Sequence, residues 1–166
     1  MATSDEIVIR HAIPSDEARV ERLVREIFPD DPHTYAANIR YPNECINVVA
    51  ESPEAGIVGF ASLLIDATPQ LGTQEWRKYS LYIGVIAVDR QYRRREISTR
   101  MLDLLARTAQ ERARQYNWLH LHVQQANEPA VKCFESFGFE RVGELGPDKD
   151  GKRSLLMRRN IRQYSR

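Results

Sequence analysis

The sequence has little cysteine and histidine, and neither is spaced for a metal site or a disulfide framework. Its 166 residues contain two cysteines, Cys45 and Cys133, which lie far apart in the chain, and four scattered histidines. Zinc sites need closely spaced ligand pairs, and disulfide-rich domains need more cysteines. We therefore expect no structural metal and no disulfide.

Long apolar runs and an excess of one charge are also missing. No stretch approaches the roughly 18 apolar residues of a membrane span, and MATSDEIVIR has no apolar run like that of a secretory signal. The formal net charge is +1, so the chain is not a polycation built for nucleic acid. We expect a cytoplasmic protein without membrane or nucleic-acid partners, folded as a single domain over residues 1–166.

The hydrophobic pattern predicts strands and helices in the order β-α-α-β-β-β-α-β-α-β-β. Alternating or all-apolar runs predict strands at 6–12, 46–52, 56–66, 80–88, 118–123, 139–145 and 154–160. Apolar residues at helical spacing predict helices at 16–28, a turn or two in 34–40, from 97 to about 116, and in 127–139 between an Asn127 cap and Gly138. This order predicts an α+β fold, a mixed sheet with helices on its faces.

One segment concentrates positive charge where a strand passes into a helix. The apolar run SLYIGVIAV is followed by Arg93, Arg94 and Arg95, and the helical pattern begins at Ile97. The first N–H groups of a helix lack intrahelical partners and carry partial positive charge, so this turn favours an anion such as a pyrophosphate. The plain alternative is a solvated loop, since charge runs usually face water.

Two windows resemble the GCN5-related N-acetyltransferase (GNAT) superfamily. IAVDRQYRRREISTRML is similar to its acetyl-CoA signature, and HVQQANEPAVKCFESFGFERV to its closing motif. The resemblance implies a sheet of about seven strands whose two parallel middle strands splay apart and admit the pantetheine of acetyl-CoA. The cofactor-binding residues that it implies are Ile86, Ala87, Val88, Arg93, Arg94, Arg95, Glu96, Ile97, Ser98, Thr99, Asn127 and Phe134.

The first window departs from the family pattern at two positions. Glu96 and Ser98 stand where the family usually has glycine or alanine. A carboxylate at position 96 would repel a phosphate unless it points away or pairs with Arg93 or Arg100, whereas the Ser98 hydroxyl can donate to a phosphate oxygen.

By this resemblance Tyr82 and His122 are the catalytic residues. An attacking amine needs a free lone pair, and imidazole, with an ordinary pKa of about 6.5, makes His122 the candidate base, with Tyr82 ordering a water between them. Strand alternation in WLHLHV places His120 and His122 on one face. A backbone N–H near Val88 would hold the oxyanion. Phe134 stands where many members have a tyrosine acid, so the acid for the leaving thiolate is missing.

Within the superfamily the chain most resembles the NatE-type protein N-terminal acetyltransferases and the ribosomal-protein-alanine acetyltransferases. That resemblance implies that Phe28 and Pro29, with Tyr82 and His122, bind the substrate, a peptide N-terminus.

Other functions stay open on the sequence. Asp30 and Asp31 would attract a small cationic amine, and such an amine is favoured as the acceptor equally with a peptide N-terminus. The departures at Glu96, Ser98 and Phe134 leave room for a catalytically weak or inactive acyl-CoA-binding regulatory domain. Trp76, in the polar segment 67–78, is either a surface anchor or a cover for the substrate, and the oligomeric state is open, a homodimer included.

Overall fold

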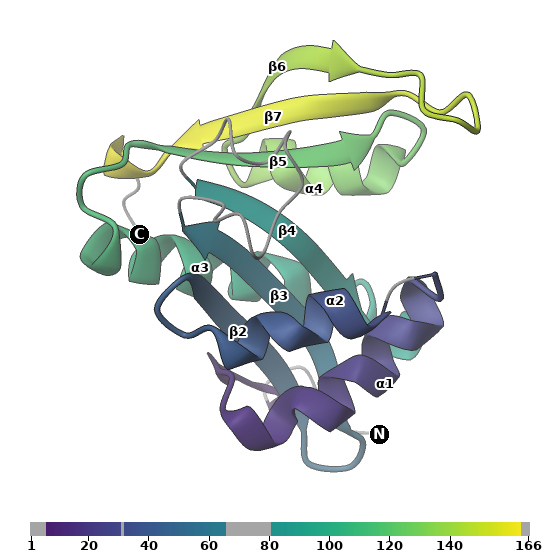
Figure 1. Ribbon diagram of the computed structural model, residues 1–166, viewed down its shortest axis with the longest axis vertical. Coiled ribbons are helices and arrows are strands. Elements are labelled where there is room, and N and C mark those ends of the chain that lie inside the picture. The colour runs from purple at the N-terminus through teal and green to yellow at the C-terminus, as the bar shows by residue number, and fades with distance from the viewer. Residues whose placement is uncertain (1–5, 31, 66–80, 164–166) are drawn as a thin grey trace.

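The computed structural model describes residues 6–30, 32–65 and 81–163 (Figure 1). The predicted element order is confirmed, and so is the α+β class. The strands are β1 Val8–His11, β2 Cys45–Ser52, β3 Gly56–Ile65, β4 Leu81–Val88, β5 Trp118–Gln124, β6 Glu140–Leu145 and β7 Ser154–Asn160, and the helices are α1 Glu17–Ile27, α2 Pro32–Ala37, α3 Ile97–Arg112 and α4 Glu128–Ser136. Asp31, Trp76 and the polar segment 67–78 lie outside the described residues.

The strands form one mixed sheet of seven strands in the order β1-β2-β3-β4-β5-β7-β6. All neighbours are antiparallel except β4 and β5, which are parallel and are joined through α3. The predicted hairpins of β2 with β3 and of β6 with β7 are both present.

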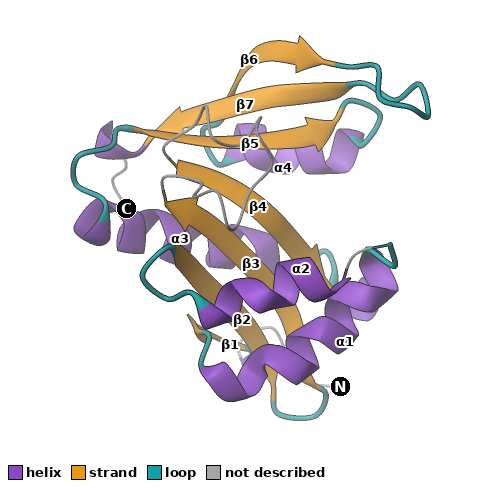
Figure 2. Cartoon of the chain, viewed as in Figure 1, coloured by secondary structure: helices purple, strands orange, loops and turns teal. Residues whose placement is uncertain are grey.

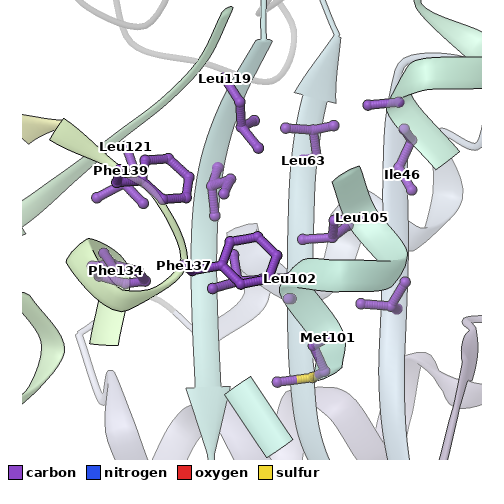
Figure 3. Close-up of a cluster of buried hydrophobic side chains, with 14 of the residues drawn as sticks. Ile46, Leu63, Met101, Leu102, Leu105, Leu119, Leu121, Phe134, Phe137 and Phe139 are labelled. Carbon is purple, nitrogen blue, oxygen red and sulfur yellow. The ribbon is translucent and has the colours of Figure 1, made fainter. Parts of the chain in front are cut away.

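Helices cover both faces of the sheet, as predicted (Figure 2). The core on one face joins α3 and α4 to the sheet. Figure 3 shows Leu105 of α3 beside Leu63, with Leu102 and Met101 further along the helix and Phe134 and Phe139 to one side. The core on the other face packs α1 and α2 against β2, β3 and β4. Burial of both apolar faces fixes the register of the central strands, because a slip of one residue would expose them.

The predicted end of the long helix near Tyr116 is wrong. Helix α3 ends at Arg112, because Ala113 leaves the helical conformation with φ −127° and ψ 52°. Arg162, which follows β7, donates to the carbonyl oxygens of Ala113 and Tyr116 at 2.8 and 2.7 Å. Arg162 thus donates hydrogen bonds to backbone carbonyls that would have accepted from backbone N–H groups if the helix had continued.

As predicted, Pro14, Ser15 and Asp16 open the first helix: they form a 3-10 turn that leads directly into α1, and Asp16 is the N-cap of α1. Its carboxylate is fully buried and accepts from Arg10, Arg19 and the backbone N–H of Ile13. Burial alone would raise the pKa of Asp16, but these hydrogen bonds hold it below its usual value. The residue therefore ties β1 to α1.

Within the described ranges no helix is long and apolar enough to span a membrane. The same residues contain no group of three His, Cys, Asp or Glu side chains that could hold a metal ion.

Candidate active site

Strands β4 and β5 pair over a short length and then separate. The pairs are Leu81 with Leu119, Tyr82 with His120, and Ile83 with Leu121. Strand β4 continues to Val88 and β5 to Gln124, and the two diverge beyond their paired segment (Figure 1). The predicted splay of the middle strands is confirmed, and the unpaired backbone of β4 can bond a ligand lying between the strands.

A β-bulge at Gly84 changes which side chains of β4 face each layer. In the pairing with β3, Ser62 opposes Val85 and Leu63 opposes Ile83, so Gly84 is an extra residue on β4. Tyr82 before the bulge and Val85 after it both face away from α3. The pairing of β4 with β5 ends at Ile83, so the bulge at Gly84 lies at the point where these two strands part.

Tyr82 and His122 are brought together at this point. Their ring centroids lie 5.1 Å apart with an edge-to-face angle of 72°. Tyr82 is buried and packs with Cys45 and Leu64. Burial raises the pKa of the Cys45 thiol to about 12, so this cysteine stays protonated and is no nucleophile beside the pair.

His120 shares a face with His122, as predicted: burial alternates along β5, with Leu119, Leu121 and Val123 buried on the other face. Burial lowers the pKa of His120, a hydrogen bond with the Leu81 backbone opposes this, and the charges of Arg158 and His122 lower it further. His120 is therefore neutral near pH 7.

The basic turn lies between the end of β4 and α3. Arg94 and Glu96 have φ of 64° and 59°, in the left-handed region where glycine is usual. Glu96 is the N-cap of α3 but makes no side-chain cap hydrogen bond. The turn therefore keeps the backbone form of a glycine-containing anion loop, and the first N–H groups of α3 receive no bond from the cap residue's side chain.

Glu96 is exposed and forms no ion pair within the described chain. The two arginines that could form an ion pair with Glu96 bond backbone carbonyls instead. Arg93 Nε donates to the Val88 carbonyl at 3.2 Å, and Arg100 Nη2 donates to the Ile7 carbonyl at 2.8 Å. Arg95 stacks over the Tyr92 ring at 4.9 Å. Of the two arrangements that would tolerate a carboxylate here, the structure has an exposed, unpaired Glu96.

Helix α4 brings the closing motif against the basic turn. Sγ of Cys133 lies 4.0 Å from Oγ1 of Thr99, in the first turn of α3. Asn127 is the N-cap of α4, as predicted, and accepts from the N–H of Ala130 at 3.4 Å. Phe134 is buried against Phe139, with ring centroids 6.0 Å apart, in the core shared with α3.

The predicted substrate residues lie at the end of α1. Phe28 packs with Tyr35 of α2, ring centroids 5.3 Å apart, on the face formed by Val85 and Ala87 of β4. Pro29 is exposed beside it. Tyr35 was not among the predicted site residues, although the sequence carries a signal for it, an aromatic residue six positions after Pro29 in the short helix TYAANIR.

A buried polar cluster fixes this segment to the sheet. Asn38 donates from Nδ2 to Ser62 Oγ at 3.2 Å, Ser62 donates to Asn47 Oδ1 at 2.7 Å, and Asn47 Nδ2 donates to the Asn38 carbonyl at 3.1 Å. Because buried polar groups are costly unless bonded, this closed set of bonds favours one position for the chain after α2.

Splayed parallel strands beside an anion-type turn are the arrangement that the resemblance to acetyl-CoA-dependent acyltransferases implies. The model of the acetyltransferase (GNAT) family matches residues 13–139, and the chain belongs to that family. The uncharacterized protein ML0378 of Mycobacterium leprae (strain TN) is 32% identical over 163 residues, which are 95% of this chain and 42% of that protein. The chain thus spans less than half of this relative.

Solved structures share the fold at low identity. NAA60 of Arabidopsis thaliana in complex with acetyl-CoA matches with a TM-score of 0.76 and 21% identity over 94% of this chain and 99% of that one. The ribosomal-protein-S18-alanine N-acetyltransferase of Escherichia coli matches with a TM-score of 0.72 and 20% identity over 96% of both chains. An aminoglycoside 6'-N-acetyltransferase complexed with coenzyme A matches with a TM-score of 0.73 and 19% identity, over 96% of this chain and 98% of that one.

Proposed function

We propose that the protein transfers the acetyl group of acetyl-CoA directly to a primary amine. The observation that carries this proposal is the contact of Tyr82 with His122 where β4 and β5 separate. Acetyl-CoA is the co-substrate of the GNAT family, and two of the structural neighbours hold acetyl-CoA or coenzyme A.

The residues of the basic turn fit the cofactor. The run Arg93–Thr99 would hold the pyrophosphate through arginine side chains, the Ser98 hydroxyl and backbone N–H groups at the start of α3. The backbone of Ile86, Ala87 and Val88, past the bulge, would bond the pantetheine arm, and Asn127 and Phe134 of the closing motif would flank it. The bound thioester supplies the activated acetyl group.

His122 acts as the general base. An ammonium has no lone pair for attack, so the acceptor must lose a proton, and a neutral imidazole accepts it directly or through water. Tyr82 orients that water from the neighbouring strand. The oxyanion that forms on the carbonyl is held by a backbone N–H near Val88, an interaction worth about 3 kcal/mol in other enzymes.

The leaving thiolate takes its proton from solvent. Phe134 has no ionisable group and is buried in the core, so it cannot replace a tyrosine acid. Protonation by water is compatible with turnover, because a thiolate is a comparatively stable leaving group.

The acceptor is a peptide N-terminus or a small amine. Phe28 with Tyr35 forms an aromatic surface suited to a peptide residue, and the E. coli neighbour is named for a protein alanine. The acid Asp30 suits a cationic amine, and another neighbour is named for aminoglycosides.

A panel assay tests the proposal. Purified protein is incubated with acetyl-CoA and either peptides with free or blocked N-termini, or polyamines and aminoglycosides, while thiol release and acceptor mass are measured. Acceptor-dependent thiol release with one added acetyl group supports acetyl transfer and identifies the class. Binding of acetyl-CoA without transfer to any amine would leave the regulatory binding domain as the function.

A further inference from the structure

A cavity lies where β5 begins and β7 ends. Its volume is about 220 Å³, and it is lined by Trp118, Gly138, Glu140, Arg158, Arg159 and Asn160. In Figure 1 these strand ends lie at the opposite side of the sheet from the end of β4. The C-terminal end of α3 leads to β5, and a helix of 16 residues is about 24 Å long, so the cavity is remote from the basic turn.

Arg158 is held in one orientation in this cavity. Its guanidinium carbon lies 3.9 Å from the centroid of the Trp118 ring, and its Nε donates to Oε1 of Glu140 at 3.2 Å. The only carboxylate of the lining is thereby engaged. Within the described chain Arg158 forms no hydrogen bond through its Nη groups, which are left to bind a ligand.

Arg159 lies on the opposite face of β7 from Arg158, because successive side chains of a strand alternate between faces, and it borders the cavity from that side. The Arg159 guanidinium lies against Gly138. A Cβ at position 138 would stand 3.0 Å from the guanidinium carbon, so the arginine fits here because residue 138 is glycine. Arg159 donates to the carbonyl of Phe137 and stacks over that ring at 4.8 Å. Burial lowers its pKa, opposed by the charge of Asp103, so an anion nearby would stabilise the charged form.

The remaining lining groups also donate. Oδ1 of Asn160 already accepts from the N–H of Arg162 at 2.8 Å, which leaves the Nδ2 of Asn160 as a donor, and the Trp118 indole can only donate. A cavity of donors with its one carboxylate engaged suits an acceptor of negative charge. Its volume is below the roughly 300–1,000 Å³ of drug-sized sites, as a small ligand requires.

We propose that this cavity binds an oxyanion, the carboxylate or phosphate group of a small molecule, at a site separate from that of acetyl-CoA. The inference does not depend on acetyl transfer. Guanidinium and amide donors such as Arg158 and Asn160 recognise both groups, so carboxylate and phosphate are tested as separate ligands.

Trp118 provides the readout, because Arg158 lies on its ring. Trp76→Phe leaves Trp118 as the one tryptophan of the chain. In this background, fluorescence is titrated with inorganic phosphate and with succinate up to roughly 10 mM, at ionic strength held constant with chloride. Saturable binding of either ion, unchanged by saturating acetyl-CoA, is expected, and the tighter ion identifies the ligand source.

Asn160→Asp is the decisive variant. It keeps the side-chain oxygen that accepts from Arg162 but replaces the donor with a negative charge, so affinity is expected to fall at least about tenfold. Arg158→Gln should have a similar effect, whereas Arg22→Gln, at an exposed position of α1, should not change affinity. No saturable binding, equal affinity in Asn160→Asp, or displacement by acetyl-CoA would each overturn the proposal.

Discussion

His122 meets the ring of Tyr82 at 5.1 Å, although the strands that carry them are paired only as far as Leu121 and Ile83. His122 is thus the first residue of β5 beyond the paired segment, and Gly84, the corresponding position of β4, is the bulge. A group that enters between the separating strands therefore reaches the imidazole before it reaches the closed part of the sheet.

Replacement of His122 tests its role as base. With the acceptor identified by the panel assay, His122→Ala should lower kcat by about 100-fold or more while the Kd of acetyl-CoA stays the same. His11→Ala, at the sheet edge, where His11 contacts Thr108, is the control and should keep full kcat. Unchanged turnover of His122→Ala above neutral pH would remove this residue from the mechanism.

Two glycine substitutions separate charge from backbone form in the basic turn. Both Arg94→Gly and Glu96→Gly relieve a left-handed conformation that costs about 1 kcal/mol in other residues. Glu96→Gly also removes a repelling charge, so the Kd of acetyl-CoA should fall several-fold, most at low salt. Arg94→Gly should raise it. Calorimetric titrations over a salt series measure both, and parallel changes in the two variants would show that charge at this turn is irrelevant.

Asp16 should be a large contributor to stability. Asp16→Ala removes a buried carboxylate and leaves the Ile13 N–H, Arg10 and Arg19 without that acceptor, so the free energy of unfolding should fall by about 3 kcal/mol. The control is Glu21→Ala, which breaks the more exposed ion pair with Arg25 and should cost less than about 1 kcal/mol. Urea unfolding measures both, and similar losses would refute the assignment.

Stability should decline as pH falls below about 6.5. The pKa values of His120 and His11 are lowered, mainly by burial, so the unfolded chain binds protons at a higher pH than the folded chain. That difference favours unfolding as pH falls from the unfolded pKa towards the folded one and has no effect well above it. His120→Gln should flatten this part of the curve of unfolding free energy against pH; an unchanged slope would contradict the assignment.

Much of the fold was predictable because long periodic segments report directly on burial. The apolar strand β4, the alternating β5 and the Asn127 cap were each correctly predicted, and so was the shared face of His120 and His122. These features depend on local sequence.

The missed features depend on partners far apart in the chain. The end of α3 is set together with Arg162, about fifty positions later, and Asp16 is buried by Arg10 and the strand beside it. The contact of Tyr35 with Phe28 follows from how α2 folds back on α1, and the Gly84 bulge appears only in the pairing of β4 with β3. The left-handed form of Glu96 could not be read from a residue that rarely adopts it.

Calorimetric titration of the purified protein with acetyl-CoA, and with dephospho-CoA in parallel, tests the central claim most directly. The account predicts micromolar binding of acetyl-CoA that weakens when salt is raised and in Arg95→Ala, since arginines and the start of α3 hold the phosphates. No heat of binding at millimolar acetyl-CoA would contradict it, and would mean that Glu96 has closed the site to the cofactor.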